Sequence, residues 1–585
     1  MNITESGQRM LASRIQFAPP FLLLFSCALL CTTGHAGLLP ARLGAGPVEI
    51  GRQTEEACRA AGQRASVQSA RFVDSGREIL QAGEGHSAVQ GTSSAYSRQE
   101  AHDAGSWGAP LKFAHATDPG REPVQEVGQT VLKRPSLRRS PRHAGASWDP
   151  FLDTLQERTL RYFLETADTV TGLSPDRFPT PAPSSIAAVG FAITSYPIAV
   201  ERGIIARDRA ASRTLTTLRF LLGLPQRQNI AVYGSHGLFY HFIDMHSGQR
   251  VWNSELSTID TGLLMAGVLF AQSYYDRENG VEGSIRLVAD SLYRRVDWRW
   301  AMNGSAGLRL AWSPEKGWSP HSWKGYNEAM IMYILALGSP TSPVPSSAWI
   351  YWTSGYIWAR YGGENFVSFG PLFGHQYSHC WIDFAGIQDQ YMASRGIDYA
   401  ENSRRATISQ CWYGLTNPAG YRGYADSIWG WTACDGPRDT SYRVDGSLRR
   451  FQGYGARGVS FDWINDDGTI APSAAGGSVA FAPEIAVPAL KAIRMRFGDR
   501  VFRKYGFIDS FNPTYTAAGE EGWFDGDYLG IDQGPIAIMI ENLRNGFVWR
   551  VMKNNRYIAR GLQAAGFIQT KGNRVKLKDQ IKPSD

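Results

Sequence analysis

The sequence predicts an all-α fold, an (α/α)6 toroid with short β-hairpins in its connecting loops. From Trp148 onward, about twelve segments of ordinary helix length carry helical periodicity. Segments that are apolar on nearly every side, such as 256–275, alternate with segments that have one apolar stripe, such as 281–297. A helix that is apolar all round is buried, whereas one with a single stripe lies at the surface. Six hairpins of such helices would form an inner and an outer ring.

Each predicted element follows from this periodicity. Strand signals are few, and Ile230–Val232, Leu238–Phe242 and Val459–Trp463 are typical of short hairpins in loops. Segment 414–477 is rich in Gly, Trp, Tyr and Asp and lacks periodicity, and loops of that length in a compact domain are usually functional. An irregular helical bundle is the alternative fold. The predicted helices are 148–168, 185–203, 207–223, 256–275, 281–297, 324–337, 346–361, 379–392, 395–413, 478–496, 534–545 and 556–566.

The N-terminal part has a different composition. Two arginines precede the short apolar run Phe21–Leu30, and Gly34-His35-Ala36 resembles a cleavage site, so residues 1–36 are predicted to be an export signal. Lipidation at Cys27 is the alternative. Residues 37–146 are poor in aromatic residues and are predicted to be a disordered, low-complexity linker. We expect a catalytic domain over 147–570, a polar tail over 571–585, and a periplasmic or secreted protein.

Charge and cysteine content exclude other classes of protein. The formal net charge of +7 includes a basic run in the linker, Lys133, Arg134, Arg138, Arg139 and Arg142. The folded part has no helix-turn-helix, zinc-finger or RNA-binding signature, so nucleic acid is not an expected partner. The apolar run near the N-terminus is too short to span a bilayer, and a monomer is expected. Cys380, Cys411 and Cys434 have no C-x-x-C spacing, which leaves a disulfide or buried thiols open.

The first candidate site is a group of carboxylates in the segment 233–260. Asp244, Glu255 and Asp260 lie close together in sequence with Trp252. Glu255 precedes the apolar helix 256–275, with Asn253 or Ser254 as the expected N-cap. A helix N-terminus favours the ionised form, which suits a base. Asp260 lies inside the apolar helix, so it is bonded, protonated or facing a polar cavity, and a purely structural cap or ion pair is the alternative.

The second and third candidate sites contain further polar residues at predicted helix entrances. Glu328 begins another apolar helix, and its alternative interpretation is an ordinary N-terminal glutamate stabilised by the helix dipole. A histidine pair at i, i+4 suggests zinc ligands, but HEXXH is absent, so no metal or other cofactor is expected. Sugar recognition fits these residues better. The predicted substrate-binding residues are Trp252, Tyr326, His375, Gln376, His379, Trp381, Asp383, Trp431 and Asp532, and the remaining candidate carboxylates are Asp435, Asp466, Asp467 and Glu484.

Several of these blocks resemble a known family. The run from Phe239 to Asp244, the block Trp252–Thr261 with Glu-Leu-Ser-Thr-Ile-Asp, and the blocks Tyr326–Met330, His375–His379 and Gly530–Gly534 resemble the bacterial "putative glucoamylase" family, which includes the β-1,2-glucanases of glycoside hydrolase family 144. The resemblance covers roughly Trp148 to Gln569. It implies an (α/α)6 barrel and metal-free, inverting hydrolysis of β-1,2-glucan to sophorose or short sophorooligosaccharides. By motif position, Glu255 and Glu328 are the strongest carry-overs, followed by Asp244 and Asp260.

The expected function is therefore an inverting glycoside hydrolase with paired carboxylates. We predict Glu328 as the general acid and Glu255 or Asp260 as a contributor to the base. A polysaccharide lyase is one alternative, because helical toroids also support β-elimination, with His375, His379, Tyr377 and Arg422 available as base and cation. A non-catalytic protein that binds glucan in the periplasm is the other alternative, since fold alone does not determine function.

Overall fold

The computed structural model describes residues 148–226, 232–516 and 521–570. The predicted signal 1–36, linker 37–146 and tail 571–585 lie outside these residues. The predominance of helix is confirmed. The helices are α4 (Phe151–Thr166), α5 (Ile186–Glu201), α6 (Arg207–Gly223), α7 (Thr258–Tyr274), α8 (Gly280–Arg295), α9 (Trp298–Met302), α10 (Met330–Gly338), α11 (Ser347–Thr353), α12 (Phe373–Trp381), α13 (Gln390–Arg395), α14 (Tyr399–Thr416), α15 (Pro472–Gly476), α16 (Pro483–Phe497), α17 (Gly530–Asn545), α18 (Phe547–Lys553) and α19 (Arg556–Ala564).

The most apolar helices pack against one another in the core. α5 packs on α7, α7 on α10, α10 on α12, α12 on α17, and α17 packs back on α5, while α15 lies against α17. Every residue of α10 and of α12 is buried. α5 and α7 lie so close together that a Cβ atom on Gly190 or on Gly267 would meet backbone atoms of the other helix within 2.4 Å. Glycine at these positions permits that packing.

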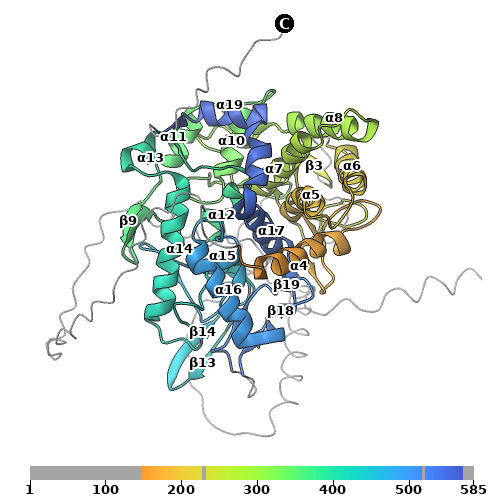
Figure 1. The fold of residues 1–585 in the computed structure, drawn as a ribbon. Coiled ribbons are helices and arrows are strands. Elements are labelled where there is room, and N and C mark those ends of the chain that lie inside the picture. Colours follow the sequence, from red (N-terminus) through yellow and green to blue (C-terminus); the bar gives the residue numbers. More distant parts are fainter. Residues whose placement is uncertain (1–147, 227–231, 517–520, 571–585) are drawn as a thin grey trace, which may run out of the picture. The chain divides into compact units, whose positions relative to one another are not determined.

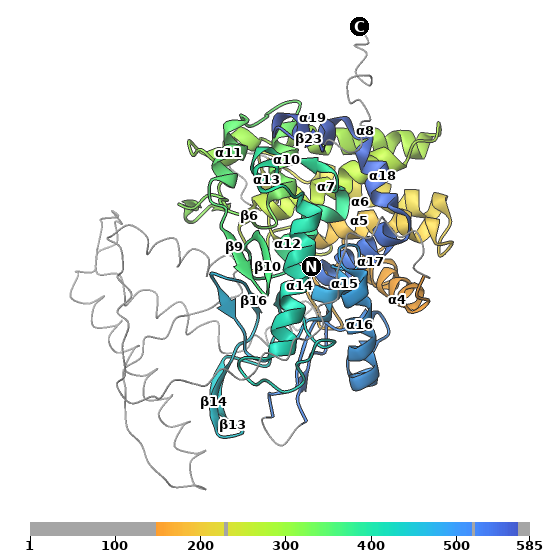
Figure 2. The ribbon, with the colours of Figure 1, turned by 60° about the vertical axis from the view of Figure 1, so that its left-hand side comes forward.

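More polar helices cover the buried ones. α4 packs on α5 and α17, α6 and α8 pack on each other and on α5 and α7, α14 packs on α12, α16 on α15, and α19 on α10 (Figures 1 and 2). α8 illustrates the type, since it buries Ile285, Leu292 and Tyr293 among polar residues. The predicted alternation of buried and amphipathic helices is therefore confirmed for these elements.

Short antiparallel strands connect the helices. In both views the β13–β14 hairpin lies at the end of the described fold opposite α19 (Figures 1 and 2). The paired strands are β1 (Arg177–Phe178) with β22 (Tyr528–Leu529), β2 (Ser184–Ser185) with β5 (Phe242–Ile243), β3 (Gly234–Ser235) with β4 (Leu238–Phe239), β6 (Leu256–Ser257) with β7 (Ala311–Ser313) and β8 (Gly317–Trp318), β9 (Trp358–Tyr361) with β10 (Glu364–Val367), β11 (Ile387–Gln388) with β23 (Ile568–Gln569), β12 (Ala433–Cys434) with β15 (Gly455–Ala456), β13 (Thr440–Val444) with β14 (Ser447–Phe451), β16 (Gly458–Val459) with β17 (Ile464–Asn465), β18 (Phe502–Arg503) with β19 (Gly506–Phe507), and β20 (Phe511–Asn512) with β21 (Trp523–Phe524).

The helices predicted to begin at 395, 478 and 534 begin instead at Tyr399, Pro483 and Gly530, and three other predicted helices are wrong by a larger margin. The helix predicted at 324 begins only at Met330, because 324–329 forms turns and bends. The helix predicted over 346–361 ends at Thr353, and 358–361 is the strand β9. The helix predicted over 379–392 is instead α12, which begins at Phe373 and ends at Trp381. In each of these three cases an apolar run was extended across an irregular segment that periodicity alone does not reveal.

Two further expectations are resolved in the described part of the chain. Cys380, Cys411 and Cys434 are free thiols, so the disulfide alternative is wrong for these three residues. Among the helices between residues 148 and 570, outside the two gaps, none has both the length and the apolar character needed to cross a bilayer.

Candidate active site

The first candidate group forms where two short strands meet the N-terminus of α7. His241 lies between β4 and β5, and its backbone N–H donates to the carbonyl oxygen of Glu255 at 2.9 Å. Glu255 directly precedes β6, and Asp260 lies in the first turn of α7. The predicted N-cap is wrong, because Ser257 caps α7 by accepting a hydrogen bond from the Asp260 N–H at 3.1 Å. Backbone pairing thus brings three titratable side chains from separate elements to one point.

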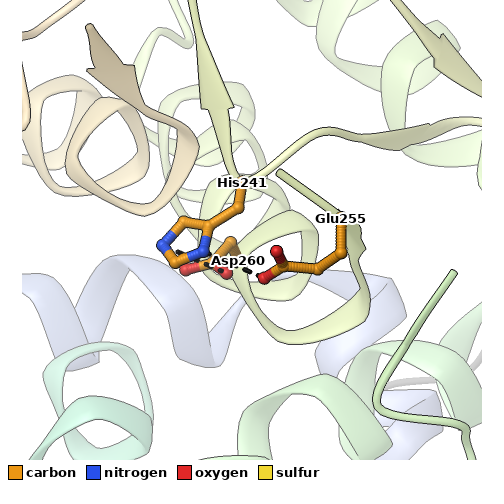
Figure 3. A group of neighbouring side chains, drawn as sticks. All are labelled: His241, Glu255 and Asp260. Atoms are coloured by element: carbon orange, nitrogen blue, oxygen red, sulfur yellow. Dashed lines mark hydrogen bonds and ion pairs between the residues drawn. The ribbon is translucent and has the colours of Figure 1, made fainter. Parts of the chain in front are cut away.

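The three side chains point toward one another (Figure 3). His241 Nδ1 lies 3.0 Å from Glu255 Oε1, and Nε2 lies 3.8 Å from Asp260 Oδ2. Ser257 Oγ donates to the Asp260 carboxylate. The Glu255 side chain is 34% exposed, compared with 10% for Asp260. Glu255 is therefore the member of this group that a large substrate can reach.

The electrostatic environment shifts the pKa values of these three side chains in different directions. Burial opposes the charge of His241, but Asp260 and Glu255 outweigh it and raise its pKa to about 9. Burial raises the pKa of Glu255, but the charge of His241 and its hydrogen bond to the carboxylate outweigh burial, so the pKa of Glu255 lies below its ordinary value. Burial raises the pKa of Asp260, partly offset by His241. At neutral pH the group thus contains a protonated His241 and an ionised Glu255.

A second group of acidic residues forms what we call the aspartate cluster: Asp176, Asp435, Asp509, Asp525, Asp527 and Asp532. Arg177 on β1 supplies the cation, with Nη1 2.6 Å from Asp435 Oδ2 and 3.8 Å from Asp527 Oδ2, and Nε 3.2 Å from Asp176 Oδ2. The Asp435 N–H donates to Asp509 Oδ2 at 2.6 Å. The pairing of β1 with β22 brings Asp176 and Arg177 beside the start of α17, where Asp532 lies.

Carboxyl groups of the aspartate cluster have raised pKa values, whereas the pKa of Glu255 in the first group is lowered. Burial, followed by repulsion from Asp532, raises the pKa of Asp509 well above its ordinary value. Burial, followed by the charge of Asp435, raises the pKa of Asp525 to about 7. Asp176 interacts electrostatically with both His241 and Asp435, so it connects the two groups. Carboxyl groups with such opposed pKa shifts in one neighbourhood are typical of acid–base sites.

Two sets of side chains in the described structure could hold a cation. The ligand atoms of His241, Glu255 and Asp260 lie within 4.8 Å of one another, as do those of Asp435, Asp509 and Asp525. In the first set the raised pKa of His241 means that a metal would have to displace a proton from its ring at neutral pH. In the second set Arg177 already binds Asp435, and the raised pKa values indicate that protons neutralise Asp509 and Asp525.

The structure brings together only part of the predicted site. Glu255 and Asp260 meet at His241, exposed Trp252 follows Arg250 in the adjoining turn, and Asp532 belongs to the aspartate cluster. Asp244 does not join them. Its Oδ1 accepts hydrogen bonds from the N–H groups of His246 and Ser247, so it closes a turn.

Glu328 precedes α10 with no exposed surface, and its carbonyl oxygen accepts a hydrogen bond from Ser378. This placement differs from that of Glu255, which is partly exposed. The prediction that Glu328 is the general acid stays a prediction.

Most of the predicted sugar-binding residues lie inside the fold. Trp381 Nε1 donates to Thr194, Gln376 Nε2 to Ala474 O and Ser478, and Trp431 Nε1 to Asp466. The polar groups of these three side chains are therefore used in hydrogen bonds within the protein. His375 Nε2 contacts Phe369 O, His379 Nε2 contacts Ser403 Oγ, Tyr326 is buried among aromatic rings, and Asp383 accepts from the Ala385 N–H.

Sequence reasoning missed much of the aspartate cluster. Asp435 and Asp532 were candidates, but Asp176, Asp509 and Asp525 lie in short loops without motif or periodicity. The missed cation, Arg177, is adjacent to Asp176. The residues come from distant parts of the chain, so only the tertiary fold brings them together. A local sequence signal exists only where aspartate lies beside glycine, as in Asp525-Gly526-Asp527, and Asp176 and Asp509 lack it.

The mainly helical fold and the grouped carboxylates are those of a glycoside hydrolase, and comparison with known proteins agrees. A family model described as "Putative glucoamylase" matches residues 320–556. A crystal structure of a putative glucoamylase from Bacteroides uniformis is 30% identical, with a TM-score of 0.63, and the match covers 73% of this chain and 99% of that one. The chain belongs to this putative glucoamylase family.

Two further relatives carry names that state an activity. The endo-β-1,2-glucanase of Chitinophaga pinensis, solved with sophorotriose and glucose, is 28% identical, with a TM-score of 0.62 over 73% of this chain and 99% of that one. An exo β-1,2-glucooligosaccharide sophorohydrolase of Parabacteroides distasonis is 28% identical over 449 residues, which is 71% of this chain. The chain spans only 57% of that relative's length.

Proposed function

We propose that this protein hydrolyses β-1,2-glucan, releasing sophorose or short sophorooligosaccharides. The observation that carries the proposal is the meeting of a partly exposed, ionised Glu255 with the protonated His241, linked through Asp176 to an aspartate cluster that retains protons. Glycosidases use two carboxyl groups, one protonated as the acid and one ionised as the base or nucleophile, and the aspartate cluster and Glu255 would supply them. The linkage follows from the relatives named for β-1,2-glucan.

The same proposal includes the topology of the helices. The contacts of α5, α7, α10, α12 and α17 return to their starting point, with α15 against α17, and each has a more polar helix on its outer side. Six inner and six outer helices would make an (α/α)6 toroid. Both candidate groups are built on the N-terminal ends of inner helices, since Asp260 begins α7 and Asp532 begins α17.

We propose an inverting mechanism. The acid protonates the glycosidic oxygen while the base activates a water on the other face of the sugar, and the two carboxyl groups are roughly 6.5–9.5 Å apart in such enzymes. Glu255, which is ionised and held by His241, is the proposed base. Asp525, whose pKa is raised to about 7, is the proposed acid, because it keeps a large protonated fraction at neutral pH. Asp260 holds His241 from the other side.

Glu328 is the acid predicted from the sequence, and the two assignments are distinguishable. An aryl glycoside with a good leaving group needs little protonation, so an acid variant retains activity on it while losing activity on glucan. We expect that behaviour from Asp525→Asn and ordinary glucan turnover from a folded Glu328→Gln. The reverse pattern would assign the acid to Glu328.

The experiment that tests the function uses the full chain. It is incubated with linear β-1,2-glucan, α-1,4-glucan and β-1,3-glucan, and the products are separated and identified. Release of sophorose or its oligomers from β-1,2-glucan alone is the expected result. Products from α-1,4-glucan alone would overturn the linkage, and unsaturated products absorbing in the near ultraviolet would assign a lyase. Binding of β-1,2-glucan without any turnover would assign a glucan-binding protein.

The proposed site of action is outside the cytoplasm. The support is the N-terminal pattern of two arginines, a short apolar run and a small-residue cleavage motif. Expression of the full chain in a bacterial host, followed by fractionation and N-terminal sequencing, tests it. A mature chain beginning near Gly37 in the periplasm or the medium is expected, and an unprocessed chain in the cytoplasm would contradict export.

A further inference from the structure

The turn that leads into Glu255 contains an unusual tryptophan. Trp252 is 59% exposed, whereas most tryptophans of the described structure are buried or half-buried. Trp252 and the following Asn253 both have positive φ, 56° and 52°. For residues other than glycine such a conformation is unfavourable, and it persists only where surrounding contacts impose it. The fold therefore holds a large apolar side chain in solvent at the expense of backbone strain.

The contacts that impose this conformation come chiefly from Arg250. Its Nε donates to Ser254 O at 2.5 Å and its Nη2 to Asn253 O at 2.7 Å, so the guanidinium closes the turn across its own backbone. The same guanidinium binds Glu315 through two hydrogen bonds of 2.7 and 3.0 Å and lies 4.8 Å from the centre of the Tyr240 ring. Only 9% of the Arg250 side chain is exposed. The planar guanidinium suits this combination of contacts.

The Arg250–Glu315 ion pair, called the clamp below, connects the turn to the sheet that begins directly after Glu255. Glu315 lies in the turn between β7 and β8, and β7 pairs with β6, which follows Glu255 directly. On the other side, the Trp252 ring lies 5.2 Å from that of Phe242, which stacks on His241 at 3.9 Å. His241 in turn binds Glu255. The exposed indole is thus fixed relative to Glu255 through both its backbone and its neighbours.

We infer that Trp252 is a sugar-binding platform for one glucosyl ring of the substrate next to Glu255, and that the Arg250–Glu315 ion pair is its positioning device. An indole face offers apolar contact to the C–H face of a pyranose, which explains why a tryptophan is kept exposed here. The carboxylate of Glu315 is 53% exposed, so its role is to hold Arg250 and not to stabilise a core. This inference rests on the proposed function, because it assigns the ligand as a glucan.

The test separates binding from turnover in the full chain. Trp252→Ala is expected to raise KM for β-1,2-glucan about tenfold, the size expected for loss of one stacked aromatic contact, with kcat changed less than about twofold and an unaltered pH profile. Trp252→Phe should recover part of the loss. Trp412→Ala is the matched control, since Trp412 on α14 is 42% exposed and packs on Tyr361. An unchanged KM in Trp252→Ala would overturn the platform.

The role of the Arg250–Glu315 clamp is tested by measuring KM and melting temperature in a Glu315 variant. Glu315→Gln is expected to raise KM about threefold and leave the melting temperature nearly unchanged, because an exposed carboxylate contributes little to folding. A fall in melting temperature with unchanged KM would indicate a merely structural role and overturn the positioning inference.

Titration of the Glu255→Gln variant with sophorotriose and with maltotriose distinguishes the two proposals. Sophorotriose binding that is weakened by adding Trp252→Ala supports the platform. Binding of maltotriose alone, weakened by the same change, would keep the platform but overturn the proposed linkage. Sophorotriose binding that is insensitive to Trp252 would overturn the platform and leave the function standing.

Discussion

The group around His241 and the aspartate cluster use the same chemical groups in opposite ways. In the first, a protonated histidine lies between Glu255 and Asp260, so the exposed carboxylate is ionised. In the second, Arg177 pairs with three of the six aspartates, and burial raises the pKa values of others such as Asp509 and Asp525. Burial raises carboxyl pKa values in both groups, and the charge of His241 and its hydrogen bond outweigh it at Glu255.

The comparison also predicts opposite dependence on neighbours. Removing the cation from the first group should raise the pKa of Glu255, because His241 is what lowers it. Removing one carboxylate from the aspartate cluster should instead lower the pKa values of the others, because repulsion between neighbouring aspartates contributes to raising them. Substitutions in the two groups therefore test different parts of one electrostatic arrangement.

The largest effect is expected at the exposed member of the first group. Glu255→Gln should lower kcat on β-1,2-glucan about a thousandfold, the middle of the range for a lost acid or base catalyst. The variant keeps the shape of the side chain, so its circular dichroism should match that of the wild type. The same substitution at buried Glu328 is the companion measurement. Near-normal turnover in Glu255→Gln would remove the first group from the mechanism.

Loss of Arg177, the cation that pairs with three members of the aspartate cluster, should mainly affect folding. Arg177→Met leaves Asp176, Asp435 and Asp527 without their ion pair and should destabilise the protein by about 3–5 kcal/mol at pH 7. Urea denaturation at pH 7 and pH 5 measures the change. The loss should be smaller at pH 5, where more of the aspartates are protonated. Equal loss at both pH values would contradict the protonation argument.

A smaller effect of opposite sign is expected at Asp525. Its pKa is raised in the folded protein to about 7, so its contribution to stability is present below about pH 4 and is lost as pH rises through about 7. Asp525→Asn removes that loss and should stabilise the protein on the order of 2 kcal/mol at pH 8, with little change at pH 4. Thermal unfolding across this range measures it. A variant less stable than the wild type at pH 8 would show that the folded protein does not raise the pKa of Asp525 above its ordinary value.

The smallest effect is expected at Asp244, which lies in the same sequence segment as Glu255 but outside the site. Its hydrogen bonds to the N–H groups of His246 and Ser247 close a turn. Asp244→Ala should cost about 1 kcal/mol of unfolding free energy, comparable to loss of a cap, with kcat and KM unchanged. Chemical denaturation and glucan turnover are measured on the same sample. A large fall in kcat would return Asp244 to the catalytic residues.

Sequence patterns predicted the helices well and the site only in part. α6 coincides with its predicted range, and α5 and α7 differ from theirs by one or two residues at each end, because long runs of apolar residues bounded by polar ones leave few alternatives. The short α12 was misplaced by several residues, since its polar histidines and glutamine are buried against other helices. Those side chains form hydrogen bonds with residues of other segments, and a local sequence pattern gives no indication of such contacts.

The same distinction holds for the site residues. Glu255 and Asp260 could be predicted because one helix start brings them together within a short segment. Asp176, Asp509 and Asp525 could not, because strand pairing and loop packing bring them together from distant parts of the chain. Trp252 could be predicted from its residue type and its place in the Trp252–Thr261 block beside Glu255. Its exposed position and the Arg250 clamp depend on backbone angles and on Glu315, about sixty residues away.

The most direct test of the account is the configuration of the first product. Linear β-1,2-glucan is digested by the full chain and followed by proton NMR from the first minutes, before mutarotation mixes the anomers. An inverting pair of carboxyl groups predicts new reducing ends in the α configuration. New reducing ends in the β configuration would contradict the mechanism and require a nucleophilic carboxylate, and the absence of any new reducing end would contradict the function.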